Sequence, residues 1–461
     1  SARHVVLVRW LDGKKTKLTI GVGRSDTKTP AGAWPELAPW SRTLEKNRAR
    51  LEAWATTTDE ESATFEVLPF TAVPVDDDSA LRAAIVAAPD DDQHRLVYAD
   101  WLLERGDVRG ELIQLQLELA RSELDPKRRN ALTQRVDALL EAGWSTLAGD
   151  AAPFTTATAF ERGFVDRVTM TVPAFLKQGE HLFSSQPIRA LTVDCPKFSE
   201  RDLTRLGEAP ALARVRSLEL AQQGPRAMPR LPLKVLARST HLSRLQELRL
   251  NFCGASPDDW AAMFGSLAAP ALEDVGFHYN HGAGALYLAL ATNPAFGRLR
   301  CVQEYRFDDL DGADGPRAMV EGFTALARRR PSMKSLDVSQ ADAVTDAALT
   351  PFFDERAVVT LEALRVNAGT FTDKTAVAIA SSRRARSLKT LQLTNGQVTI
   401  AGVTALLSSP NLASLEHLDV RGDREFWPED EARLGELRSL IRSKSLRSVE
   451  VQAVVLRGSA T

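Results

Sequence analysis

Two histidines and one acidic loop are the groups in this sequence whose spacing could support metal chemistry. His278 and His281 lie three residues apart, so two imidazoles could reach one zinc ion, but no third ligand is evident in the sequence. The loop 308–315 (DDLDGADG) is rich in carboxylates, yet it lacks the glutamate that an EF-hand needs at its twelfth position. We therefore expect a polar surface patch and a solvated loop, and no metal or other cofactor.

The sequence contains no motif of nucleophilic, metallohydrolase or phosphate-binding chemistry. The patterns G-x-S-x-G, H-E-x-x-H and G-x-x-x-x-G-K-[ST] are absent. Cys195, Cys253 and Cys301 have no C-x-x-C spacing, and we interpret each as a buried thiol. The aspartate triplets at 76–78 and 90–92 precede helical segments, where aspartates commonly act as caps. We expect a protein that is not an enzyme.

The elements that position any binding site are set by a repeated leucine pattern. Leu388, Leu391 and Leu393 form an L-x-x-L-x-L frame that recurs from Val168 to Val449, at spacings between 23 and 31 residues. That period is typical of a leucine-rich repeat. The second apolar positions of the successive frames are Val168, Leu191, Leu218, Leu248, Val275, Tyr305, Leu336, Leu364, Leu391, Leu418 and Val449.

Each repeat offers a short strand followed by a segment with helical apolar spacing, such as Ile400, Val403 and Leu406. One unit cannot bury its apolar face alone, so we expect the strands to stack into a parallel sheet with helices outside it. Because helices are wider than strands, the stack should curve. The segment 402–420 (GVTALLSSPNLASLEHLDV) resembles the ribonuclease-inhibitor-like class of leucine-rich repeat. The expected fold class is α/β, a horseshoe solenoid over residues 160–461.

Some units depart from the repeat frame. The family's Asn/Cys position holds Cys253 and Asn280 in two units but other residues elsewhere, so we expect an incomplete ladder of buried side chains. In the unit V-Q-E-Y-R-F, Tyr305 and Phe307 replace leucines, which places them inward in this alignment.

Residues 1–72 are expected to form a small α+β module. Strands are predicted at 4–10, 17–23 and 64–68, with a hairpin at Asp12-Gly13 and a helix from Arg42 to Trp54. The order of elements resembles a WGR domain, a module associated with nucleic-acid contact. Val22 replaces the signature tryptophan, and only Gly23 and Arg24 match the signature.

Residues 76–150 are expected to be a helical module. The segments YADWL (98–102), ERGD (104–107) and RGE (109–111) resemble a bacterial repeat-companion domain found beside leucine-rich repeats. The resemblance continues to Glu161–Val165, and the family has no established catalytic residues. We expect the charged side chains in these motifs to form turn caps and internal ion pairs. A helix from Asp125 to Glu141 should cap the open end of the solenoid.

Composition limits the class of partner. The formal net charge is −2 with 26% charged residues, which gives no electrostatic footprint for nucleic acid. No apolar stretch is long enough to span a membrane, and the N-terminus has no apolar signal segment. These features favour a cytoplasmic protein that binds another protein.

The side-chain period of a strand selects the residues that face away from the core. One row comprises Arg167, Thr192, Glu219, Arg249, Gly276, Arg306, Asp337, Arg365, Gln392, Asp419 and Glu450. The adjoining row comprises Asp194, Asn251, His278, Asp308, Ser339, Asn367, Thr394, Arg421 and Gln452.

Arginines at the centre of an interface are frequent hot spots, so Arg249, His278, Arg306 and Arg365 are the main candidates for binding a partner, together with Asp337, Gln392, Asp419 and Arg421. The sequence therefore predicts a non-enzymatic recognition or regulatory subunit that grips a protein with its concave face, in a bacterial signalling or defence system. The alternative is a nucleic-acid-linked sensor that uses the N-terminal module.

Overall fold

The computed structural model describes most of the chain. The described residues are 5–12, 16–21, 63–67, 78–121, 124–195, 198–222, 233–252, 254–280, 283–307, 316–339, 344–367, 369–421, 446, 448–451 and 454–457. The chain folds into two compact units, Ser1–Asp107 and Val108–Thr461. The boundary falls inside the segment 76–150, and the three-part division expected from the sequence stays a prediction.

The described residues of the first unit form a small sheet and two helices. Strands β1 (Val5–Asp12), β2 (Thr16–Gly21) and β3 (Ala63–Val67) form an antiparallel sheet in the order β2-β1-β3. The predicted helix from Arg42 to Trp54 and the residues Val22, Gly23 and Arg24 lie outside the described residues. Helices α3 (Asp78–Ala87) and α4 (Asp92–Leu103) follow, and the Asp91 carboxylate caps α4 by accepting from the backbone N–H of Gln93.

The second unit begins with two helices that pack on the start of the solenoid. These are α5 (Val108–Leu119) and α6 (Pro126–Ala148), and they are followed by short 3₁₀ turns η2 (Gly149–Phe154) and η3 (Ala157–Ala159). Leu112 in α5 and Val136 in α6 belong to the same hydrophobic cluster as Val168 in the first long strand. The two helices therefore extend the repeat core.

A hairpin of β4 (Phe160–Glu161) and β5 (Phe164–Val165) joins these helices to the repeats. The Arg109 side chain donates to the carbonyl oxygens of Leu147 and Gly163, and it lies 5.2 Å from the ring centre of buried Phe164. Glu111 forms an ion pair with Arg135 at 2.7 Å. Both charged residues of the RGE motif thus contact other parts of the fold: Arg109 bonds backbone carbonyls in a partly buried place, and Glu111 forms its ion pair at the surface.

Within the described residues, a 12-stranded sheet runs through the rest of the second unit in sequence order. All neighbours from β6 to β16 pair in parallel, and β17 pairs antiparallel with β16. The strands are β6 (Arg167–Met170), β7 (Ala190–Cys195), β8 (Ser217–Gln222), β9 (Glu247–Asn251), β10 (Asp274–Asn280), β11 (Cys301–Phe307), β12 (Ser335–Ser339), β13 (Ala363–Asn367), β14 (Thr390–Thr394), β15 (His417–Asp419), β16 (Ser448–Val451) and β17 (Val454–Arg457).

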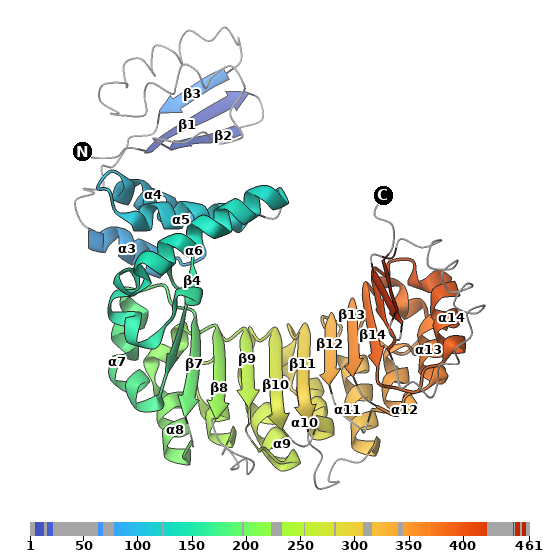
Figure 1. The fold of residues 1–461 in the computed structure, drawn as a ribbon. Coiled ribbons are helices and arrows are strands. Elements are labelled where there is room, and N and C mark those ends of the chain that lie inside the picture. Colours follow the sequence, from blue (N-terminus) through green and yellow to red (C-terminus); the bar gives the residue numbers. More distant parts are fainter. Residues whose placement is uncertain are drawn as a thin grey trace. The chain divides into compact units, whose positions relative to one another are not determined.

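Helical segments connect the strands and cover one face of this sheet (Figure 1). The α-helices are α7 (Val172–Ser185), α8 (Glu200–Glu208), α9 (Pro257–Ser266), α10 (Ala283–Thr292), α11 (Pro316–Arg329), α12 (Asp346–Leu349), α13 (Asp373–Ser381) and α14 (Ile400–Ser408). The 3₁₀ segments are η4 (Pro210–Arg214), η5 (Leu233–Arg238), η6 (Pro294–Phe296), η7 (Thr350–Phe352), η8 (Arg383–Ser387) and η9 (Pro410–Leu412).

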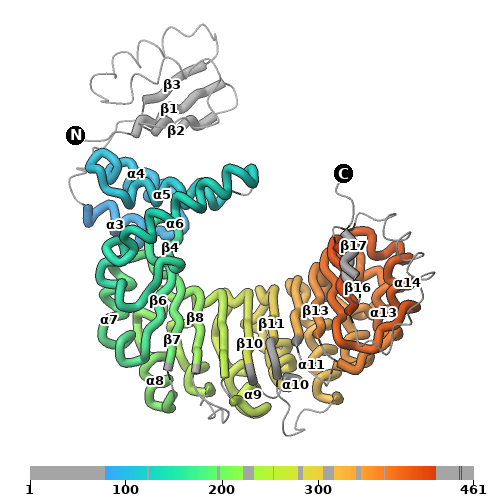
Figure 2. The backbone as a smooth tube through the Cα atoms, viewed as in Figure 1, coloured from blue at the N-terminus to red at the C-terminus, as the bar shows by residue number. Residues whose placement is uncertain are grey.

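The sheet curves with its strands on the inner side and the helices on the outer side, and Figure 2 shows the same curvature in the backbone trace. Parallel strands alternate with helices in this way because each unit buries its apolar strand face against its own and the neighbouring helix. The second unit is a leucine-rich-repeat horseshoe of the α/β class, as the repeat pattern predicts.

The leucine frame is correct in all but one unit. Leu364, Leu391 and Leu418 lie in register on β13, β14 and β15 and are fully or almost fully buried. The exception is β11, where Val302 rather than Tyr305 pairs with Val275 and Leu336. The prediction that Tyr305 holds this core position is wrong by three residues.

A ladder of threonine and aspartate side chains joins the later repeats. Asp346 at the start of α12 accepts hydrogen bonds from the backbone N–H and hydroxyl of both Thr372 and Thr375. Asp373, one unit later, accepts the same two bonds from Thr399. These carboxylates also lie at helix N-termini, where negative charge is favoured. Asp346 and Asp373 therefore each fix the start of the helix in the next unit.

Among the described residues, no helix is both long enough and apolar enough to cross a membrane.

Candidate partner-binding surface on the concave face

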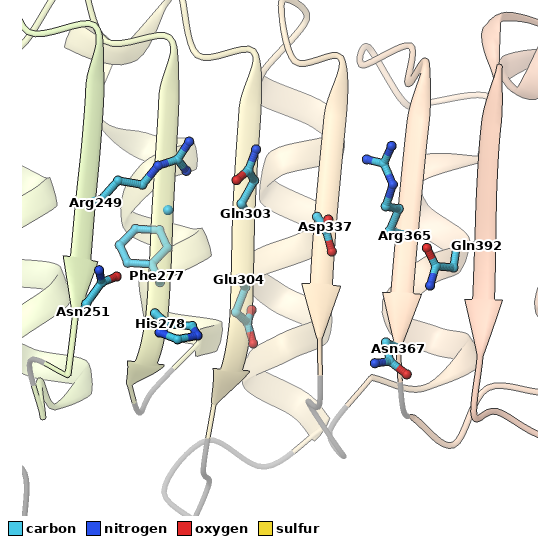
Figure 3. Close-up of a pocket in the computed structure, with 11 residues that line it drawn as sticks. Arg249, Asn251, Phe277, His278, Gln303, Glu304, Asp337, Arg365, Asn367 and Gln392 are labelled. Atoms are coloured by element: carbon cyan, nitrogen blue, oxygen red, sulfur yellow. The ribbon is translucent and has the colours of Figure 1, made fainter. Parts of the chain in front are cut away.

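A shallow hollow lies on the inner face of the sheet, across β9 to β14 (Figure 3). Its volume is about 430 Å³. The lining residues are Arg249, Asn251, Gly276, Phe277, His278, Gln303, Glu304, Asp337, Arg365, Asn367 and Gln392. Most of these come from the two rows that the strand period selects, so the hollow coincides with the centre of the predicted surface.

The strand register places five of the candidate residues in the hollow. Arg249, Asp337, Arg365 and Gln392 lie in one row, and His278 lies in the adjoining row. The register between these strands therefore brings together side chains that are far apart in the sequence.

Two arginines were assigned to the wrong place in the first row. Gln303 holds the β11 position, because it pairs with Gly276 and Asp337; Arg306 lies three residues further along the strand. Thr169 holds the β6 position opposite Thr192, whereas Arg167 pairs with Ala190. At β11 the frame was shifted by three residues, whereas at β6 the frame residue Val168 is correct and the residue before it was chosen in place of the residue after it.

Asp419 and Arg421 do not line the hollow. The Arg421 guanidinium donates to both carboxylate oxygens of Asp419, at 2.9 and 2.6 Å. This pair lies near the C-terminal end of the sheet, and its charges are already directed at each other.

Arg249 is held from both sides by carboxylates. Its guanidinium lies 2.8 Å from a Glu247 oxygen and 3.0 Å from an Asp274 oxygen. The side chain reaches Asp274 because position 276 is glycine: a Cβ there would lie 2.2 Å from an Arg249 nitrogen. Burial raises the pKa of Asp274, although the positive charge of Arg249 opposes that rise. Arg249 is therefore a structural part of the hollow wall.

A polar network forms the edge of the hollow on β7 to β10. The Asn251 amide donates to Glu219 at 2.7 Å, and the Thr192 hydroxyl donates to the other oxygen of Glu219 at 3.0 Å. The His278 ring meets the Phe252 ring edge to face, with 5.6 Å between centres. Burial lowers the pKa of His278, so its imidazole is neutral at pH 7 and offers both a donor and an acceptor.

Asp337 and Arg365 lie at the middle of the hollow. They are in register on β12 and β13 and both are half-buried. Burial raises the pKa of the Asp337 carboxyl, and the positive charge of Arg365 opposes this rise. The centre of the surface thus presents one acidic and one basic group side by side.

Glu304 is a buried acid that the sequence frame did not identify as a core residue. It takes the inward position on β11, in register with Phe277 and Val338, and is 2% exposed. The Tyr287 hydroxyl of α10 donates to one carboxyl oxygen, and the other oxygen has no hydrogen bond within the described residues. Burial, with a smaller effect from Asp337, raises the pKa of Glu304 well above its ordinary value.

We expect Glu304→Gln to stabilise the protein more at pH 8 than at pH 5. Because the folded-state pKa is raised, the folded chain holds this proton more tightly than the unfolded chain does. The stability cost of Glu304 is therefore absent below the unfolded pKa and grows as pH rises toward the folded pKa. Glutamine can still accept from Tyr287, so the gain in stability should be larger near neutral pH and above than at pH 5.

The measurement is the thermal unfolding midpoint of both proteins at pH 5 and pH 8. Equal shifts at the two pH values would show that Glu304 does not titrate differently on folding.

The structure offers no support for a metal site within the described residues, where no three His, Cys, Asp or Glu side chains are grouped suitably. His281, Cys253 and the acidic loop 308–315 lie outside the described residues. Cys301 is half-buried, and burial raises the pKa of its thiol.

No protein-family model matches the chain, and no curated protein matches it. Among solved structures, it is similar to the crystal structure of the Rad7 and Elc1 complex in yeast, at 17% identity, over 58% of this chain and 79% of that chain, with a TM-score of 0.27. It is also similar to the TLR13–ssRNA13 complex, at 12% identity, over 56% of this chain and 38% of that chain, with a TM-score of 0.29. Likenesses with TM-scores this low leave the function to be argued from the chain itself.

Proposed function

We propose that the protein is a non-enzymatic scaffold that binds another protein on the concave face of its solenoid. The hollow across β9 to β14 is the observation that carries this proposal. Its wall mixes amides, a neutral imidazole and charges of both signs, which suits the polar and hydrogen-bonding surface of a protein. A polyanion would meet Asp337 and the carboxylates around Arg249, which disfavours nucleic acid here.

The biological setting proposed is that of a cytoplasmic recognition or regulatory subunit of a bacterial signalling or defence system. Support comes from the companion-domain motifs at 98–111 and from the way α5 and α6 join the first repeats in one core. The nucleic-acid-linked alternative depends on Val22, Gly23 and Arg24, which lie outside the described residues, and on no observation in the structure.

The test compares two triple variants of the full chain. One variant, Gln303→Ala, Arg365→Ala and Gln392→Ala, removes side chains from the hollow that hold no carboxylate of the fold in place. The matched control, Arg317→Ala, Glu321→Ala and Arg328→Ala, changes exposed residues on the outer helix α11. Arg249→Ala is avoided because it would leave Glu247 and Asp274 without their cation.

Tagged wild type and both variants are used to recover proteins from host lysate, and the affinity of each is then measured for the purified partner. We expect the hollow variant to bind about tenfold or more weakly than the wild type with an unchanged melting temperature, since central arginines commonly contribute most of the binding energy. Equal affinities of all three proteins would reject the concave face as the binding surface.

A further inference from the structure

Asp337 and Arg365 are an acidic and a basic side chain that feel each other's charge but make no hydrogen bond or ion pair within the described residues. They are neighbours in the strand register, yet no hydrogen bond and no ion pair with nitrogen and oxygen within 4.0 Å joins them, and neither has a hydrogen bond or ion pair with another residue of the described ranges. Both line the hollow and are half-buried. Figure 3 shows them on adjacent strands, with Gln392 beyond Arg365 and Gln303 before Asp337.

The other described arginines of the candidate set differ in this respect. Arg249 contacts Glu247 and Asp274 at 2.8 and 3.0 Å, and Arg421 donates to Asp419 at 2.6 Å. A half-buried charge gains most from a partner when the protein itself supplies none. The central pair is therefore the place where a bound molecule can add the most charge-assisted hydrogen bonds.

Four residues in register form one series across β11 to β14. They present, in order, an amide, a carboxylate, a guanidinium and an amide, from Gln303, Asp337, Arg365 and Gln392. Their strands are hydrogen-bonded neighbours, so the spacing along the series is about 4.8 Å. A molecule that matches the series must present a basic group and an acidic group about that far apart.

A helix fits this spacing better than an extended strand does. Residues three or four apart on one helix face are separated along the axis by about 4.5–6 Å. Residues on one face of a strand are separated by about 6.6–7 Å, so successive side chains of a bound strand would not match the spacing between neighbouring strands of the sheet. The geometry therefore favours a helix that lies across the strands, along the direction in which the repeats stack.

Building on the function proposed above, we propose that the row Gln303, Asp337, Arg365 and Gln392 binds a helix of the partner protein. A lysine or arginine of that helix pairs with Asp337, and an aspartate or glutamate one turn away pairs with Arg365. The flanking glutamines accept or donate hydrogen bonds to the polar residues on either side.

The probe is a displayed library of peptides held in a helical scaffold, with the residues of one face randomised, selected against the full-length wild-type chain. A second library presents the same randomised residues on an extended strand. We expect binders from the helical library, enriched in a basic and an acidic residue three or four positions apart, and few or none from the extended library.

Coupling between the chain and a selected peptide then tests the pairing itself. Neutralising the peptide's acidic residue should weaken binding to the wild type about fivefold and have no further effect on an Arg365→Gln protein. Neutralising its basic residue should behave in the same way toward Asp337→Asn. Arg329→Gln, an exposed change on α11, is the control that should leave all affinities unchanged.

Three results would overturn this inference. Peptides that lose affinity for the Gln303, Arg365 and Gln392 triple variant but show no charge coupling would reject the charge pair and keep the concave face. Peptides that bind this variant with the same affinity as the wild type would reject both the charge pair and the concave face. A helical library that yields no binder, or fewer than the extended library, would reject the helix.

Discussion

Leu391→Asp should unfold the C-terminal part of the solenoid. Leu391 is fully buried and lies in register between Leu364 and Leu418, which are also buried. Truncation to alanine at such a site costs roughly 2–5 kcal/mol, and an unpaired carboxylate in the same place costs more. Because each repeat is stabilised by its neighbours, loss of this unit should spread to β15 and α14.

Gln392→Asp is the control for this change. It introduces the same carboxylate at the next residue, which faces the hollow and is half-buried. Circular dichroism and hydrogen exchange of the full chain should show lost protection in β13 to β15 for Leu391→Asp and little change for Gln392→Asp. Similar melting of Leu391→Asp and wild type would contradict the repeat frame.

Arg330→Met should destabilise the middle of the solenoid by roughly 3 kcal/mol or more. Arg330 is 5% exposed, and its guanidinium donates to the carbonyl oxygens of Leu290, Asn293 and Phe296. These carbonyls lie at the ends of α10 and η6, where helices leave backbone acceptors that need further donors. Methionine preserves most of the apolar stem but removes three hydrogen bonds. The backbone N–H groups of Phe296 and Leu299 still reach the carbonyls of Asn293 and Phe296, whereas the buried Leu290 carbonyl loses the Arg330 donor.

Arg329→Met is the matched variant, since Arg329 is the preceding residue and is exposed. Its unfolding midpoint should stay within about 0.5 kcal/mol of the wild type. Equal midpoints for the two methionine variants would mean that the buried guanidinium contributes nothing to the repeat stack.

Most of the sheet could be predicted because its strands carry leucine or valine at fixed spacing. The frame failed at β11, where Glu304 takes an inward position that an apolar residue fills in the neighbouring strands. Because Glu304 interrupts the apolar pattern, Tyr305 and Phe307 gave the stronger apolar alternation. The frame was therefore placed on Tyr305, three residues after Val302, which holds the core position. Only the partner strands show that a buried acid, satisfied in part by Tyr287, can replace the apolar residue.

The ladder between repeats was missed for a different reason. The family pattern directs attention to the Asn/Cys position after each strand, whereas the ladder seen in the described residues runs through Asp346 and Asp373 at helix starts. A signal was present in the sequence, because Thr345, Thr372 and Thr399 recur at the same place in successive units and two of them precede aspartate.

The side-chain period of two predicted which residues lie in the concave rows. It could not predict which of their charged side chains already form ion pairs within the protein. Which arginines are already paired depends on contacts within and between strands, such as those of Arg249 with Glu247 and Asp274. Gly276 was in the predicted row, but the sequence could not show that its missing side chain leaves room for Arg249. The distinction between Arg249 and Arg365 therefore required the structure.

Site-specific photo-crosslinking in the host tests the central claim most directly. A photoreactive amino acid replaces Gln303 in the hollow in one protein and Arg329 on the outer helix α11 in another. We predict a discrete crosslinked product with one partner protein from position 303, and none from position 329. The same product from both positions, or one from position 329 alone, would contradict binding on the concave face.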